Sequence, residues 1–251
     1  MEIIAEYKNK ISSIGFSENS NDKVVEYLLN HRHIIDYGSF SENPNDKAVD
    51  YLINNPQYID INFFSKNPND RSVKYLLENK DKMKMNLTCL SLNPNDIAVE
   101  FLLNNPEHIN FGLFSENPNE KAVKYLLQNI NKLYSGSFSM NSNDAAVNFI
   151  LHNLDYIFDS FSKNKNDKAV QFLLNNHDYI DWECFSMNPN DKAVDYLLNH
   201  IERIDWTSFS ENTNDKAVKY LLQNPRKIDW NRLSDNKSFY NHIFYEEIIL
   251  K

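Results

Sequence analysis

One stretch recurs, slightly altered, along most of this 251-residue chain: Ser41-Glu42-Asn43-Pro44-Asn45-Asp46-Lys47-Ala48-Val49-Asp50-Tyr51-Leu52-Ile53. Every copy opens with a serine. The opening serines are Ser17, Ser41, Ser65, Ser91, Ser115, Ser139, Ser162, Ser186, Ser210 and Ser234. They lie 24 residues apart, except for one step of 26 and one of 23. Self-similarity at such a period indicates a stacked repeat array. We name each repeat by its serine and count positions from it, the serine being position 0.

The apolar positions of the repeat have the spacing of a helix. Position 8 is valine in all nine full copies, position 10 is Tyr or Phe, and positions 11 and 12 are leucine or isoleucine. Together with the small residue at position 7 they cover an arc of about 200° on a helical projection. An arc this wide predicts a helix that packs on a partner and on both neighbouring repeats.

Both ends of this helix have sequence signals. Position 2 is Asn in all ten copies and Pro usually follows, which predicts an N-cap at Asn43. Asp46 then falls where a capping box has its acidic residue and complements the helix dipole. At the other end Asn55 tolerates a left-handed conformation and Pro56 stops the helix. The Ser41 repeat should therefore have a helix over residues 44–54, about 16 Å long.

A second, shorter helix is expected before each serine. Asp60 and Asp205 can cap such a helix of six or seven residues, partly 3₁₀, before Ser65 and Ser210. Two helices per repeat predict an all-α fold, an α-solenoid of about nine to ten 24-residue repeats. We expect an N-terminal cap at residues 1–16, the array at 17–234 and a C-terminal capping helix at 235–251. Ten repeats at 8–10 Å spacing predict a curved rod about 90 Å long.

Composition limits the possible partners. The net charge of −9 disfavours nucleic acid, which needs a basic face, and favours a basic partner. Mean hydropathy is −0.60, and no apolar run has the length of a membrane span or of a secretory signal. Cys89 and Cys184 share a repeat position four repeats apart, too far for a disulfide. Free thiols fit a reducing compartment such as the cytosol.

No motif predicts catalysis, a metal, a cofactor or a small-molecule substrate. The histidines form no zinc-like pattern, and His152 and His200 stand where Asn is usual, which favours a helix-end role. The four glycines are placed in the turn before position 0 and form no phosphate-binding loop. The serine at position 0 is expected to be a hydrogen bonder rather than a nucleophile.

Three recurring features could serve binding or structure. The acidic row at position 5 could bind cations, but helix capping is favoured. The row Trp182, Trp206 and Trp230 could be an exposed strip, but packing between short helices is favoured. Positions 6 and 9 face solvent and could be a solvated face with pairs such as Asp70–Lys74 and Asp215–Lys219. They also provide the candidate binding residues: Lys47, Asp50, Arg71, Lys74, Lys121, Lys124, Lys192, Asp195, Lys216 and Lys219.

The repeat Ser-x-Asn-Pro-Asn-Asp-x-Ala-Val-x-Tyr-Leu-Leu-x-Asn, followed by Ile-Asp-Trp-x-x-Phe, resembles the Asn-rich tandem repeats of giant, mimivirus-like DNA viruses. The resemblance covers residues 17–234. In period the repeat is also similar to leucine-rich-variant repeats. The resemblance implies a viral protein made in the host cytoplasm, including the viral factory or virion, and carries over no catalytic residues.

A solenoid that varies on its exposed positions while holding its core fixed is typical of protein-binding scaffolds. We therefore expect a non-catalytic scaffold for protein–protein interaction, its partner being a host or viral protein. The alternative is an RNA-binding solenoid that reads single-stranded RNA or serves the translation machinery.

Overall fold

The computed structural model describes residues 12–79 and 87–247, and these form helices and turns without a strand. The predicted all-α repeat fold is confirmed. Each repeat that lies wholly within the described residues has a long helix, a 3₁₀ turn and a short helix, as in α5 (Asp46–Asn54), η3 (Pro56–Tyr58) and α6 (Ile61–Phe64). The 3₁₀ turn is a third element that the sequence pattern did not predict.

The long helices begin at position 5, except in the last repeat. They are α3 (Asp22–Asn30), α5, α7 (Asp70–Asn79), α8 (Asp96–Asn104), α10 (Glu120–Gln128), α12 (Asp144–His152), α13 (Asp167–Asn175), α15 (Asp191–Asn199), α17 (Asp215–Gln223) and α19 (Lys237–Glu247). The short helices are α2 (Ser13–Glu18), α4 (Tyr37–Glu42), α6, η4 (Leu87–Leu92), α9 (Phe111–Glu116), α11 (Ser135–Ser139), η8 (Asp159–Lys163), α14 (Trp182–Ser186), α16 (Trp206–Phe209) and α18 (Trp230–Asp235). The turns between them are η2 (Arg32–Ile34), η3, η5 (Pro106–His108), η6 (Ile130–Lys132), η7 (Leu154–Tyr156), η9 (His177–Tyr179), η10 (Ile201–Arg203) and η11 (Pro225–Lys227).

The predicted N-cap was wrong by two residues. Asn45, not Asn43, caps α5, and its side-chain oxygen accepts a hydrogen bond from Lys47 N. Asn43 is buried, and its side-chain oxygen accepts from Asn45 N at 3.0 Å, which forms the turn before the helix. Asp46 is therefore the first helical residue rather than the acidic member of a capping box. Its charge still lies at the positive end of the helix dipole.

The end of the long helix also differs from the expectation. Asn55 has φ −135° and ψ 63°, so it is not left-handed. Its side-chain amide instead donates to Tyr51 O at 2.8 Å, which satisfies a carbonyl that the helix leaves unpaired. His200 does the same through Nδ1, 2.9 Å from Tyr196 O. The helix-end role expected for His200 is thus confirmed.

The core consists of the same positions in every repeat. Ala48, Val49 and Leu52 of the long helix are fully buried, as is Phe40 of the short helix before it. Positions 10 and 12, such as Tyr51 and Ile53, are half-buried and pack against this core. One continuous hydrophobic layer therefore runs through all repeats, as in other stacked repeat proteins.

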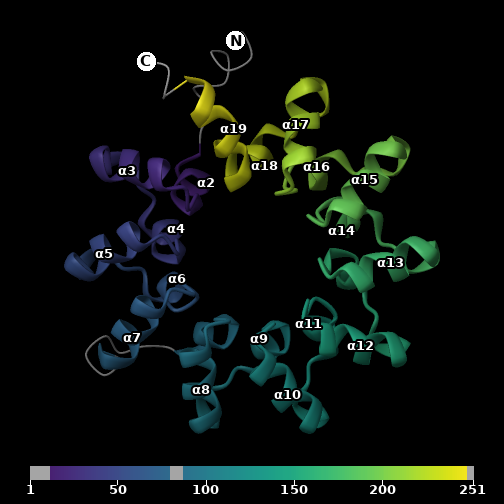
Figure 1. Cartoon of the computed structure of the whole chain (residues 1–251), viewed down its shortest axis with the longest axis horizontal. Coiled ribbons are helices and arrows are strands. Elements are labelled where there is room, and N and C mark those ends of the chain that lie inside the picture. The colour runs from purple at the N-terminus through teal and green to yellow at the C-terminus, as the bar shows by residue number, and fades with distance from the viewer. Residues whose placement is uncertain (1–11, 80–86, 248–251) are drawn as a thin grey trace.

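The array is a closed ring, not the predicted rod. Figure 1 shows the short helices around a central opening and the long helices on the outer rim. Helix α2 packs against both α18 and α19, so the last repeat contacts the first. Each repeat thus places its short helix on the inner side of the ring and its long helix on the outer side. A bend of about 36° per repeat closes the ring after ten.

The seam of the ring departs from the repeat pattern. Tyr240 of α19 is fully buried; its Oη accepts from Ser12 N at 3.0 Å and lies 2.6 Å from Ser234 O. A Cβ at Gly15 would lie 2.7 Å from the carbonyl carbon and oxygen of Asp235, so only glycine allows this approach. The predicted placement of glycines in turns was wrong, because all four lie within short helices: Gly15, Gly38, Gly112 and Gly136.

Residues 1–11, most of the expected N-terminal cap, lie outside the described residues. Helix α2 is the short helix that precedes the first serine. At the other end α19 occupies the place of a tenth long helix, and it packs on α17 as well as α2.

Candidate binding surfaces

A row of buried asparagines joins consecutive repeats. The Asn117 side-chain amide donates to Ser91 O at 2.9 Å and to Asn93 O at 2.8 Å, both in the preceding repeat. The same pair of bonds forms in every repeat from Asn43 to Asn236. Since these side chains are buried and fully bonded, the row is structural.

The serine at position 0 is also structural. Ser186 is fully buried; its Oγ donates to Trp182 O at 2.7 Å and accepts from Asp205 N at 3.0 Å. It ties the end of one short helix to the start of the next. The expected hydrogen-bonding role is confirmed.

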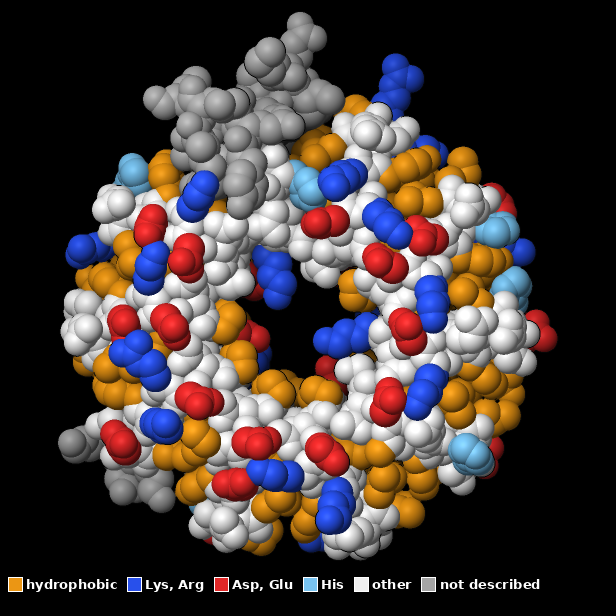
Figure 2. Space-filling model, in the orientation of Figure 1, with side chains coloured by type: hydrophobic (Ala, Val, Ile, Leu, Met, Phe, Trp, Pro, Cys, Tyr) orange, Lys and Arg blue, Asp and Glu red, His pale blue; other side chains and the backbone are white. Residues whose placement is uncertain are grey.

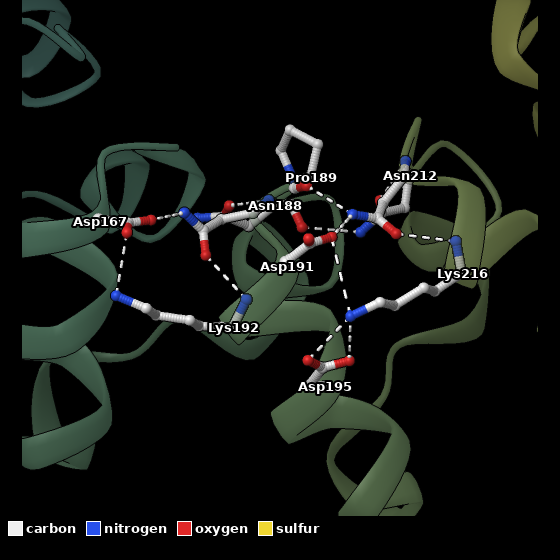
Figure 3. Close-up of polar contacts among 10 residues, drawn as sticks. Asp167, Asn188, Pro189, Asp191, Lys192, Asp195, Asn212 and Lys216 are labelled. Carbon is white, nitrogen blue, oxygen red and sulfur yellow. Dashed lines mark hydrogen bonds and ion pairs between the residues drawn. The ribbon is translucent and has the colours of Figure 1, made fainter.

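A ladder of charged and amide side chains, here called the charge ladder, runs along the starts of the long helices (Figure 3). Asp167 Oδ1 accepts from the Asn190 side-chain amide at 2.7 Å, and Asp167 Oδ2 lies 3.0 Å from Lys192 Nζ. Lys216 lies 3.9 Å from the equivalent carboxylate, Asp191, and pairs more closely with Asp195 of the same preceding repeat, at 2.7 Å. Figure 2 shows acidic and basic side chains alternating around this face of the ring.

Most of the ten predicted binding residues belong to this ladder. Seven form ion pairs between neighbouring repeats: Lys47, Asp50, Arg71, Lys121, Lys192, Asp195 and Lys216. The other three, Lys74, Lys124 and Lys219, form no ion pair within residues 12–79 and 87–247. The pairs expected within one helix do not form. Asp70 instead accepts from the Asn95 amide, and Asp215 lies 3.3 Å from His242 Nε2.

The ladder lowers the pKa of its carboxyl groups. A hydrogen bond from Asn119, followed by the bond and charge of Lys121, holds the pKa of Asp96 below its ordinary value. The pKa values of Asp22, Asp144 and Asp167 are lowered by the equivalent asparagines and lysines. The hydrogen bond to Glu100 in turn raises the pKa of Lys121. These charges are satisfied within the ring, which leaves little of them for a partner.

The tryptophan row packs against the next repeat. The Trp206 ring stacks on Tyr220, with centroids 6.1 Å apart and planes 14° from parallel, and Lys227 Nζ lies 4.6 Å from its centroid. Trp182 stacks on Tyr196 and lies beneath Arg203. Both tryptophans are half-buried, so the expected packing role is confirmed for these two.

The opposite ends of the long helices carry the exposed apolar residues. We call this region, positions 15–19 of each repeat, the turn surface. Seven of the nine exposed large hydrophobic side chains in the described residues lie on it: Tyr58, Ile130, Tyr134, Leu154, Phe158, Tyr179 and Ile201. The most exposed is Tyr134, at 60%.

Two of these residues replace a helix cap. Tyr134 and Phe158 are the N-cap residues of α11 and η8 and form no side-chain capping bond. Asp36, Asn110 and Asp205 cap the equivalent helices elsewhere. The sequence interpretation missed this site. The signal was present, because aromatic residues break an otherwise Asp/Asn position in two consecutive repeats.

The turns of the Ser139 and Ser162 repeats carry negative charge that no cation in the described residues neutralises. Asp155, Asp159 and Asp178 are exposed and form no ion pair within the described part of the chain. No Lys or Arg occurs in residues 153–159 or 176–181. This region differs in kind from the charge ladder, where carboxylates are paired.

The remaining candidates for chemistry are weak. Burial, with a hydrogen bond to Asp181, raises the pKa of the Cys184 thiol to about 11, which disfavours a nucleophilic thiolate. No group of side chains suited to a metal occurs in the described residues, and none of their helices is long and apolar enough to cross a membrane. A shallow cleft of about 360 Å³ lies at the seam, lined by Glu18, Glu211, Arg232 and Lys237 among others.

Comparisons of the chain with protein-family models, with curated proteins and with solved structures found no match.

Proposed function

We propose that this protein is a non-catalytic scaffold whose closed ring binds a protein partner through the turn surface. The observation that supports this most is the concentration of exposed apolar side chains at one end of the long helices. Exposed apolar side chains that gather on one surface of a protein are typical of interaction sites. A closed ring also holds neighbouring turns in fixed register, which reduces the entropy lost when several of them contact one partner.

RNA binding remains the alternative but gains no support from the charges. An RNA-binding face needs an excess of cations. The lysines of the charge ladder alternate with carboxylates and pair with them, and the turns of the Ser139 and Ser162 repeats carry only acidic charge. That the protein is viral and acts in the host cytoplasm, viral factory or virion is part of the proposal and rests on the repeat resemblance alone.

Affinity purification at physiological salt tests the proposal. One half of the sample is treated with nuclease before mass spectrometry, and the other half is not. Proteins that stay bound after nuclease treatment support the scaffold. Recovery of RNA, with loss of all bound protein after treatment, would replace it with the RNA-binding alternative.

A further inference from the structure

Four exposed apolar residues in two consecutive repeats form a candidate docking site. They are Ile130 and Tyr134 of the Ser115 repeat and Leu154 and Phe158 of the Ser139 repeat, and they are 42–60% exposed. Helix α11, which follows Tyr134, packs against both η7 and η8. Ser160 Oγ donates to Gly136 O at 3.0 Å and joins the two repeats at this place. We call these residues, with Asp155, Asp159 and Asp178, the docking arc.

The Ser115 and Ser139 repeats lack a stabilising N-cap at the positions where they expose Tyr134 and Phe158. An N-cap Asn or Asp typically stabilises a helix by about 1 kcal/mol. Tyr134 has φ −96° and ψ 106°, close to the φ −84° and ψ 101° of the capping residue Asn110. The backbone could therefore accept an Asn cap, and the aromatic side chain is not required by the fold. Departures from local structural rules with no structural gain are expected at functional sites.

Position 15 is an exposed apolar residue in the same two repeats and at Ile201, whereas it is Pro in three repeats and Arg32 or His177 in two others. Ile130 and Leu154 stand where Pro56, Pro106 and Pro225 begin the equivalent 3₁₀ turns. Asn129 before Ile130 has φ −133° and ψ 56°, near the values of Asn55 before Pro56. Proline would fit at residue 130, so the backbone does not require the exposed isoleucine.

The charge of the docking arc indicates the kind of partner. Its three carboxylates are exposed and have no ion-pair partner in the described residues. The cation of the same turns, Lys132, is half-buried, with its Nζ over the Phe111 and Tyr125 rings. A second copy of the chain would bring two sets of these carboxylates together, which is unfavourable. A segment with basic and apolar side chains would neutralise them and cover the four apolar groups.

We propose that the docking arc binds an amphipathic, basic segment of a protein partner. This rests on the proposed scaffold function and specifies its surface and partner chemistry. The apolar residues supply most of the affinity and the carboxylates supply orientation and faster association, as is usual at interfaces.

The test uses the full-length ring and three fluorescent 14-residue peptides, composed of Lys and Leu, of Glu and Leu, or of Lys and Ser. Fluorescence anisotropy measures binding. We expect the Lys–Leu peptide to bind at least tenfold more tightly than the other two. Failure of this peptide to bind, or equal binding of all three, would overturn the proposal.

Two double variants locate the site. I130P/Y134N gives the Ser115 repeat the residues of the preceding Ser91 repeat, Pro106 and Asn110. It should unfold at higher urea yet bind the peptide at least tenfold more weakly. D155N/D178N should weaken binding several-fold and reduce its salt dependence. The matched control D144N/D167N changes the same charge in the same repeats at the charge ladder, and binding should stay within twofold.

The outcomes separate this proposal from the proposed function. If I130P/Y134N captures the same protein partners as the native ring after nuclease treatment, the docking-arc proposal is wrong and the scaffold proposal stands. If the native ring captures no protein at all, the scaffold itself fails. Concentration-dependent dimerisation in sedimentation, lost in I130P/Y134N, would assign the arc to a second copy and overturn the basic-segment proposal.

Discussion

The side-chain amide of Asn19 in the first repeat donates to Lys237 O in the last, at 2.9 Å. Elsewhere the equivalent asparagine bonds to positions 0 and 2 of the preceding repeat, as Asn117 does with Ser91 and Asn93. At the seam Asn19 bonds instead to position 3 and to Asn241 Oδ1, while Tyr240 Oη lies next to Ser234 O. The ring thus closes by a modified form of the same row of bonds.

Closure should depend on Gly15. We expect Gly15→Ala to lower the free energy of unfolding by about 1–3 kcal/mol, because the new methyl group would overlap the Asp235 carbonyl. Amide hydrogen exchange should then speed up in α2 and α19 before other helices. The matched control is Gly136→Ala, where nothing lies within 4 Å of the added Cβ. Its free energy of unfolding should increase by about 0.5–1 kcal/mol through helix propensity. Equal losses in both variants would show that closure does not depend on the close contact between Gly15 and Asp235.

The buried asparagine row should contribute more to the free energy of unfolding than the helix caps do. Asn117→Ala leaves two buried carbonyls and the Asn119 N–H without partners. We expect a loss of about 3–5 kcal/mol in urea unfolding, at 1–3 kcal/mol per unpaired buried group. Asn119→Ala removes a more accessible cap and should cost about 1 kcal/mol. Similar losses for the two variants would show that position 2 acts only as a turn residue.

The charge ladder should make stability depend on pH. The folded-state pKa of Asp96 is lowered, so its contribution is present above the ordinary value of 3.8 and is lost as pH falls through the folded-state pKa. In Asp96→Asn the side-chain oxygen can still accept from Asn119, but the charge is gone. We expect the variant to be less stable than the native chain at pH 7 and equal to it near pH 2, in urea titrations at both values. A stability difference of the same size at both pH values would mean that the ion pair between Asp96 and Lys121 does not cause it.

Glu116 should behave in the opposite way. Burial raises its pKa, so its ionised form is disfavoured in the folded state and stability falls as pH rises through the ordinary value of 4.5. Glu116→Gln keeps the shape and removes the charge. It should increase the melting temperature at pH 7 and leave it almost unchanged at pH 3.5. An increase of the same size at both pH values would rule out ionisation as the cause.

Cys184 should react slowly while the ring is folded. A thiol pKa of about 11 instead of the ordinary 9.0 lowers the thiolate fraction at pH 8 by about two orders of magnitude. Iodoacetamide labelling followed by mass spectrometry measures the rate, with the urea-unfolded chain as the reference. Equal rates in the folded and unfolded chains would contradict the shielded environment of this thiol.

The repeat itself was predictable because local patterns determine it. The apolar residues at positions 7, 8 and 11 have helical spacing, and each is buried as that spacing requires. Asp60 and Asp205 cap the short helices as expected from their side-chain chemistry. The cap of the long helix was placed at Asn43 rather than Asn45, because both are asparagines near a proline and local preference does not separate them. Which one is buried depends on the neighbouring repeat.

By itself the sequence determined the period, the two helices of each repeat and the identity of the core positions, since these depend on interactions within about one repeat. Only the tertiary structure decided that the array closes. Closure depends on a small bend added over ten repeats and on contacts between Gly15 and Asp235, which are 220 residues apart. The tertiary structure also decided which charged residues form ion pairs. Lys121 can reach Glu100 only because adjacent long helices stack side by side, so bonds between repeats replace the pairs that one helix alone would predict.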